Sequence, residues 1–229
     1  MAVCARARVE TAMNARLLAL LLLLAGCAGG RSAPDWQANA HVALAAHVSA
    51  WFAGRDRVAA QELDTARREV ARTGDATQLA RVELTACAAR LASLETGECP
   101  AFTPLSQDAD AGAHVYAAYL AGRWQGLDAQ QLPAAQQAVV STTDALATVQ
   151  AITDPLARLV AAGALLRAGR LPPQGIALAI DTAAQQGWRR PLLAWLGFDR
   201  ERLAAAGDKT GAAARQRRMD IVGGQLSDR

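Results

Sequence analysis

Apolar residues recur along most of this chain at the spacing of an α-helix. Between positions 38 and 52, for example, Leu44, Val48 and Phe52 follow one another at intervals of four residues and share one helical face. β-branched residues are scattered and do not alternate with polar ones, so the pattern favours helices over strands. The predicted helices span about residues 38–52, 58–72, 76–94, 109–122, 133–149, 155–168, 176–186, 191–196, 199–206 and 210–222.

Residues that start or stop helices separate these segments. Asp154-Pro155 is typical of a helix start, because aspartate caps the first turn and proline is tolerated within it. Gly54 and Gly169 follow predicted helices at positions that favour chain reversal. The long irregular stretch is 95–108. We therefore predict a single all-α domain over residues 35–229.

One segment near the C-terminus carries a repeat-like pattern. Ala183-Ala184-Gln185-Gln186-Gly187, followed by Leu196-Gly197, resembles the Ala-Ala-x-x-Gly … Leu-Gly signature of Sel-like repeats, which are related to tetratricopeptide repeats. The spacing between the two glycines is one residue longer than in that family, Pro191 lies between them, and no period of about 34 residues holds along the chain. The expected fold is thus a set of helical hairpins, either tetratricopeptide-like or an irregular helical bundle.

The N-terminal region differs from the rest. Arg6, Arg8 and Arg16 precede the uninterrupted apolar run Leu17–Leu24, which is followed by Ala25-Gly26-Cys27. The run is about half as long as the 18–20 residues that a transmembrane helix needs. A basic start, a short apolar core and small residues at the end are typical of a signal peptide. A start at Met13 would give a more compact signal than a start at Met1.

Leu24-Ala25-Gly26-Cys27 resembles the lipobox of bacterial lipoproteins. The resemblance implies that residues 1–26 are removed, that Cys27 carries a diacylglycerol and an N-acyl chain, and that the protein lies in the cell envelope. Ala28, in place of the aspartate that retains such proteins in the inner membrane, implies the outer membrane, facing the periplasm. Residues 27–34 are expected to form a flexible tether. The lipid on Cys27 is the sole cofactor-like group that we expect.

The charge balance excludes one class of partner. The chain has 24 Lys and Arg and 21 Asp and Glu, and removal of residues 1–26 leaves 21 and 20. The remaining chain is nearly neutral and has no basic stripe, so nucleic acid is not an expected partner.

Cys87 and Cys99 are the two cysteines that remain once Cys4 is removed and Cys27 is lipidated. In an oxidising compartment such a pair favours a disulfide. Catalytic dithiols usually have two intervening residues, so the wider spacing here argues against redox activity. A buried thiol at Cys87 is the alternative.

The sequence has no Gly-x-Ser-x-Gly elbow, zinc-protease helix, phosphate loop or Ser-x-x-Lys motif, so we assign no catalytic residue and no metal ligand from it. His41 and His47 are six residues apart and point to different faces of one helix, which is wrong for a shared metal. We interpret them, with His114, as helix-surface residues. Glu95 and Glu98 lie beside a turn, where solvated charges are common.

Aromatic residues gather at two helix ends. Tyr116, Tyr119 and Trp124 form one group, and Trp188, Trp195 and Phe198 form the other. Trp188, Arg189 and Arg190 lie in a predicted turn between Gly187 and Pro191, and an exposed tryptophan beside arginines is typical of a protein-binding hot spot. Packing between neighbouring helices is the alternative interpretation of both groups.

Together these features predict a lipid-anchored envelope protein that binds other envelope proteins as an assembly scaffold. Its partners would be the membrane, through Cys27, and an envelope protein. The alternative is an envelope enzyme, or an accessory factor of one, that acts on peptidoglycan or glycans. Two converging carboxylates in a cleft would favour the enzyme, and a groove without such a pair would favour the scaffold.

Overall fold

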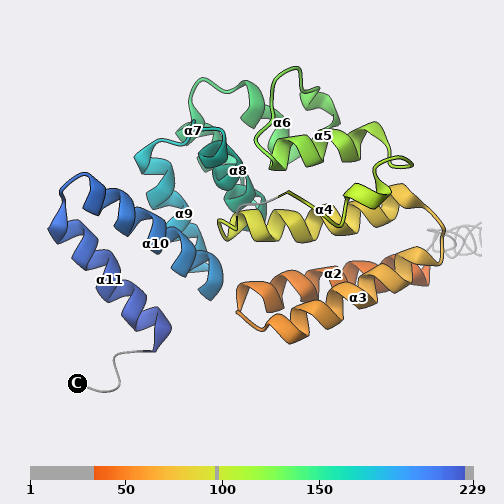
Figure 1. Cartoon of the computed structure of the whole chain (residues 1–229), viewed down its shortest axis with the longest axis horizontal. Helices are drawn as coiled ribbons and strands as arrows, with labels where there is room; N and C mark the ends of the chain where they lie inside the picture. Colours follow the sequence, from red (N-terminus) through yellow and green to blue (C-terminus); the bar gives the residue numbers. More distant parts are fainter. Residues whose placement is uncertain (1–33, 96–97, 225–229) are drawn as a thin grey trace, which may run out of the picture. The chain divides into compact units, whose positions relative to one another are not determined.

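The computed structural model describes residues 34–95 and 98–224, and every regular element within them is helical. The lipobox, the signal peptide and the tether lie outside the described residues, apart from Pro34. The α-helices are α2 (Asp35–Phe52), α3 (Asp56–Ala71), α4 (Ala76–Ala92), α5 (Ala111–Leu120), α6 (Ala134–Ser141), α7 (Ala145–Ala151), α8 (Pro155–Arg167), α9 (Pro173–Gln185), α10 (Arg189–Ala205) and α11 (Lys209–Gly223) (Figure 1). Two short 3₁₀ turns, Thr103–Leu105 and Ala129–Gln131, lie in the connections. The prediction of an all-α fold is confirmed.

Aspartate side chains fix where several helices begin. Each accepts a hydrogen bond from the backbone N–H three residues further on, which satisfies one of the unpaired donors of the first turn and contributes about 1 kcal/mol to stability. These N-cap residues are Asp75, Asp110, Asp144, Asp154 and Asp208. The cap predicted at Asp154 is among them.

Two predicted boundaries are wrong. The segment expected as one helix over residues 133–149 is broken into α6 and α7, because Thr142 is extended and Asp144 caps a new helix start. Conversely, the two short helices expected over 191–196 and 199–206 form one continuous helix, α10. Trp195, Leu196 and Asp199 are buried on one side of α10, and this packing outweighs the low helix propensity of the intervening glycine.

The main core forms where α4 crosses α8, and both helices also pack against neighbouring helices. Gly163 of α8 makes the close crossing possible, since a Cβ atom there would lie 2.8 Å from the carbonyl oxygen of Leu91. α8 also packs against α9, which extends the core, and α9 in turn packs against α10. α10 and α11 form an antiparallel hairpin at the C-terminal end (Figure 1).

A smaller core holds the N-terminal hairpin together. Alanines of α2 meet larger residues of α3 and small residues of α4. Its buried members are Ala40, Ala43, Leu63, Ala66, Val70, Val82 and Ala86. Phe52, at the end of α2, belongs instead to the main core, so α2 contributes to both.

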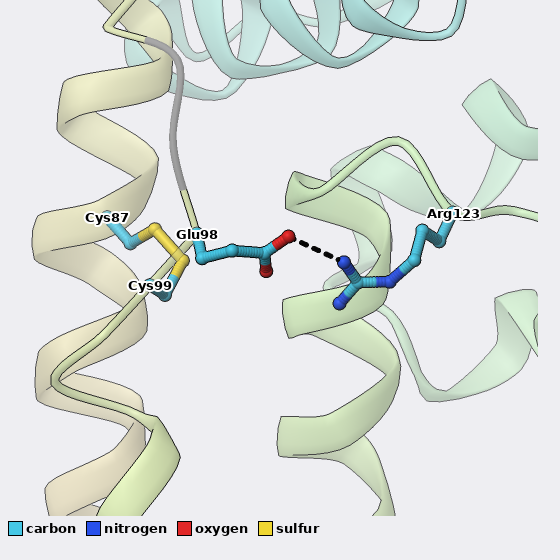
Figure 2. The surroundings of a disulfide bond; sticks show 4 residues. All are labelled: Cys87, Glu98, Cys99 and Arg123. Atoms are coloured by element: carbon cyan, nitrogen blue, oxygen red, sulfur yellow. Dashed lines mark hydrogen bonds and ion pairs between the residues drawn. A yellow bond between two sulfur atoms is a disulfide. The ribbon is translucent and has the colours of Figure 1, made fainter.

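A disulfide joins Cys87 of α4 to Cys99 in the irregular segment, with a Cα–Cα distance of 5.8 Å (Figure 2). The predicted pairing is confirmed. Beside it, Glu98 accepts a hydrogen bond of 2.9 Å from Arg123, which follows α5. The disulfide therefore holds the start of the irregular segment against α4.

Among the helices that the structure describes, none combines the length and the apolar composition needed to cross a membrane.

Replacement of Cys87 and Cys99 together by serine should lower the free energy of unfolding by about 3 kcal/mol, since the cross-link restricts the unfolded chain. Urea unfolding of the oxidised wild type and the double variant measures this difference. Reduction of the wild type should reproduce the loss, and the variant should not respond to reductant. Equal stability of all three forms would show that the bond contributes nothing to the fold.

Candidate functional site

A groove of about 610 Å³ lies between α2 and the start of α8, and we call it the α2 groove. Its apolar wall on α2 consists of Leu44, Val48 and Phe52. Pro155 and Leu156 of α8 face them. The groove is within the size range of pockets that bind ligands or peptide side chains, and its lining is mostly apolar.

The sequence of α2 explains why this wall is apolar. From Trp36 to Gly54 the chain has no Asp, Glu, Lys or Arg. Val42, on the outer side of α2, is 67% exposed. A helix at the end of a helical stack usually turns a charged face to solvent, so an uncharged one favours contact with another molecule.

Polar side chains lie among the apolar ones. They are His41, Ser49, Thr85, Asp154 and Gln186. An apolar floor with polar groups around it is the usual composition of a surface that receives an amphipathic partner.

A second groove, of about 620 Å³, meets the first at Asp154, and we call it the α6–α7 groove. Small residues from α6 and α7 line it, among them Ala135, Ala138 and Ala147. Small side chains allow another backbone to approach closely. The two grooves share Asp154, so they form neighbouring parts of one recessed surface.

Asp154 holds a defined position on this surface. One carboxylate oxygen accepts a hydrogen bond of 2.6 Å from the N–H of Ala157, as an N-cap. Arg158 is one turn further along α8, but its Nε donates to the carbonyl of Ile152. Of the described residues that line either groove, Asp154 is the one acidic residue.

The predicted exposed turn at Trp188, Arg189 and Arg190 has a different structure. Trp188 is the N-cap residue of α10, and both arginines belong to its first turn. The ring of Trp188 packs on Phe52, with 4.6 Å between ring centroids, and forms one end of the α2 groove. Arg189 is exposed and donates to the carbonyl of Val222.

Arg190 is only partly exposed and has partners within the fold, so the prediction of a freely exposed side chain is wrong for it. Its guanidinium carbon lies 3.8 Å from the ring centroid of Trp51, and its side chain is 22% exposed. It forms ion pairs with Asp56, at the start of α3, and with Glu95, beyond α4. Trp51, Asp56, Glu95 and Arg190, which we call the Arg190 cluster, therefore join four segments of the chain.

The aromatic group on α5 belongs mostly to the core, as the alternative interpretation proposed. Tyr119 is 0% exposed, stacks on Trp124 and donates a hydrogen bond of 2.5 Å to Gln136. Tyr116 and Trp124 are half-buried, and the guanidinium of Arg170 lies 5.2 Å from the Trp124 ring centroid. Burial raises the pKa of both tyrosines well above the usual range. Tyr119 cannot contact a partner in this conformation.

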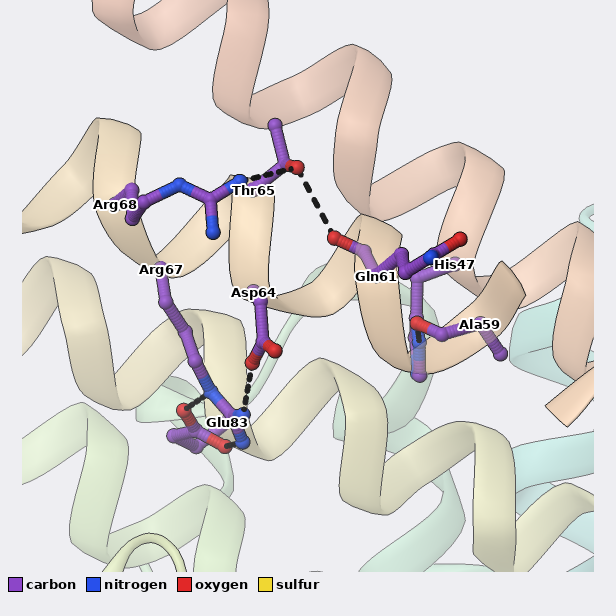
Figure 3. Close-up of polar contacts among 8 residues, drawn as sticks. All are labelled: His47, Ala59, Gln61, Asp64, Thr65, Arg67, Arg68 and Glu83. Atoms are coloured by element: carbon purple, nitrogen blue, oxygen red, sulfur yellow. Dashed lines mark hydrogen bonds and ion pairs between the residues drawn. The ribbon is translucent and has the colours of Figure 1, made fainter. Parts of the chain in front are cut away.

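Polar contacts tie α2, α3 and α4 together (Figure 3). Arg67 donates to both carboxylate oxygens of Glu83, at 2.6 and 2.8 Å, and also to Asp64. The Nδ1 atom of His47 lies 2.7 Å from the carbonyl oxygen of Ala59. His47 is buried, contrary to the prediction of a surface residue, and burial lowers its pKa. His41 and His114 are exposed, as predicted.

Two carboxylates near the disulfide are each paired with an arginine. Glu95 and Glu98 line a small pocket of about 190 Å³ with Cys87, but Glu95 pairs with Arg190 and Glu98 with Arg123. Within residues 34–95 and 98–224, no three His, Cys, Asp or Glu side chains are placed to hold a metal ion.

Comparison of the chain with protein families, with characterised proteins and with solved structures finds no match. Sequence reasoning missed the grooves; the uncharged stretch from Trp36 to Gly54 is the signal that could have indicated one wall.

Arg190→Ala should lower the free energy of unfolding by about 1–2 kcal/mol, because it removes a cation–π contact and two ion pairs. Arg189→Ala is the matched control, since it changes the same residue type one position away, and its effect should stay within about 0.5 kcal/mol. Urea unfolding of both variants measures the difference. Equal effects would show that the Arg190 cluster does not hold these segments together.

Proposed function

We propose that this protein is an outer-membrane lipoprotein, anchored by a diacylglycerol and an N-acyl chain on Cys27, that faces the periplasm. The support is the lipobox Leu24-Ala25-Gly26-Cys27 behind a short apolar run. The Cys87–Cys99 disulfide fits an oxidising compartment.

The helical domain binds another envelope protein and acts as an assembly scaffold. The α2 groove is the observation that carries this proposal, because it is recessed, mostly apolar and bordered by polar side chains. The uncharged surface of α2 extends it. We assign the binding surface to this groove, and no longer to Tyr119 or Arg190, which have partners within the fold.

The enzyme alternative has less support. Most enzymes that hydrolyse glycans use two carboxyl groups on either side of the glycosidic bond that is cleaved, and one of the two acts as the acid. The α2 groove contributes one carboxylate, Asp154, and Glu95 and Glu98 are each paired with an arginine. We therefore do not propose catalysis.

Cys27→Ser should leave a precursor that keeps its signal peptide, because the lipid-dependent peptidase acts on the modified cysteine. Mass spectrometry of the protein from fractionated envelopes should show a lipid-bearing N-terminus at Cys27 in the wild type and an intact signal peptide in the variant. Normal processing of the variant, with unchanged fractionation, would rule out lipid anchoring.

A photoreactive amino acid at Ala45 should form adducts with an envelope protein in living cells, because Ala45 is exposed and lines the α2 groove. Ala213, an exposed alanine of α11, is the matched control. Adducts at position 45 and not at position 213 would support a scaffold that uses the groove. The same adducts at both positions, or none at position 45, would contradict it.

A further inference from the structure

The composition of the two grooves restricts what they can bind. The α2 groove has an apolar floor and several polar side chains, and the α6–α7 groove is lined by alanines together with Thr148, Ile152, Thr153 and Asp154. A simple hydrocarbon chain would leave the polar groups without partners, which is unfavourable once water is displaced. A helix with one apolar face and polar flanks would satisfy both kinds of surface, and alanines would let its backbone approach.

The charge of the surface restricts the occupant further. Asp154 lies where the two grooves meet, and it is exposed. One of its oxygens caps α8, and the other accepts no hydrogen bond from the part of the chain that the structure describes. Since Arg158 is turned to the carbonyl of Ile152, the negative charge of Asp154 is available to a cation from outside.

We propose that the recessed surface formed by the two grooves binds an amphipathic helix of a partner protein that carries a lysine or arginine beside its apolar face. The apolar face lies on Leu44, Val48 and Leu156, and the basic residue pairs with Asp154. This inference rests on the proposed scaffold function and names the class of segment that the scaffold recognises.

Two labelled amphipathic peptides test it, identical in length and leucine face and differing in one position beside that face, lysine in one and glutamate in the other. Their binding is measured by fluorescence anisotropy with the full-length protein in lipid nanodiscs, with empty nanodiscs subtracted. The lysine peptide should bind about fivefold more tightly, which corresponds to about 1 kcal/mol for an exposed ion pair. The preference should decrease as salt is raised.

Asp154→Asn removes the charge and keeps an N-cap, since asparagine caps a helix as well as aspartate does. The variant should bind both peptides equally. Asp144→Asn is the matched control, because Asp144 caps α7 in the same way and does not line the grooves. That variant should keep the fivefold preference. Leu156→Ala should lower the affinity for both peptides by the same factor.

Several results would overturn the proposal: no binding of either peptide, equal affinities in the wild type, or a preference that survives Asp154→Asn. Binding of the neutral dye N-phenyl-1-naphthylamine without binding of either peptide would assign the grooves to an apolar small molecule or an acyl chain instead. The peptide experiment tests the class of partner, whereas crosslinking at Ala45 tests the scaffold function, so one can fail without the other. Groove adducts without peptide discrimination would leave the scaffold function standing and reject this class of partner.

Discussion

The contact between the end of α2 and the start of α10 is the constraint on which the α2 groove depends. Phe52 packs on Trp188, and the guanidinium of Arg190 covers the ring of Trp51 while it pairs with Asp56 and Glu95. α2 forms one wall of the groove and α8 forms the other. The contact between α2 and α10 holds the α2 wall in place, so it fixes the width of the groove. The buried alanines of the smaller core hold α2 on α3 and α4, but they do not contact α10.

The first and last helices of the described domain differ in charge. α11, the last helix, has no buried residue and presents basic side chains such as Lys209 and Arg217 to solvent, beside the exposed Ile221. α2, the first helix, is uncharged from Trp36 onward and exposes Val42. A charged outer face suits a terminal helix that ends a stack, whereas an apolar one suits a helix that meets another molecule. This difference supports the proposal that the partner binds at the α2 end of the described domain.

Local patterns in the sequence predict the helices and the caps, because these depend on residues within a few positions of each other. Asp154-Pro155 is an example, and Cys87 and Cys99 are close enough along the chain for their pairing to be inferred. The role of Arg190 is not local: its partners Glu95 and Asp56 are 95 and 134 positions away. The sequence alone therefore predicts an exposed turn at Arg189 and Arg190. The grooves could not be predicted from the sequence either, because α2, α8 and the start of α10 are far apart along the chain and meet only in the tertiary fold.

Hydrogen exchange of the wild-type protein tests most directly whether α2 is held in place as one wall of a preformed groove. If the contacts of Phe52 and Trp51 hold α2, the amides of its C-terminal half should exchange about as slowly as those of α8, in the main core. A terminal helix without such contacts opens locally and exchanges close to the rate of an unfolded chain. Slow exchange in α2 is the result that we predict. Fast exchange in α2 beside slow exchange in α8 would contradict the existence of a preformed groove.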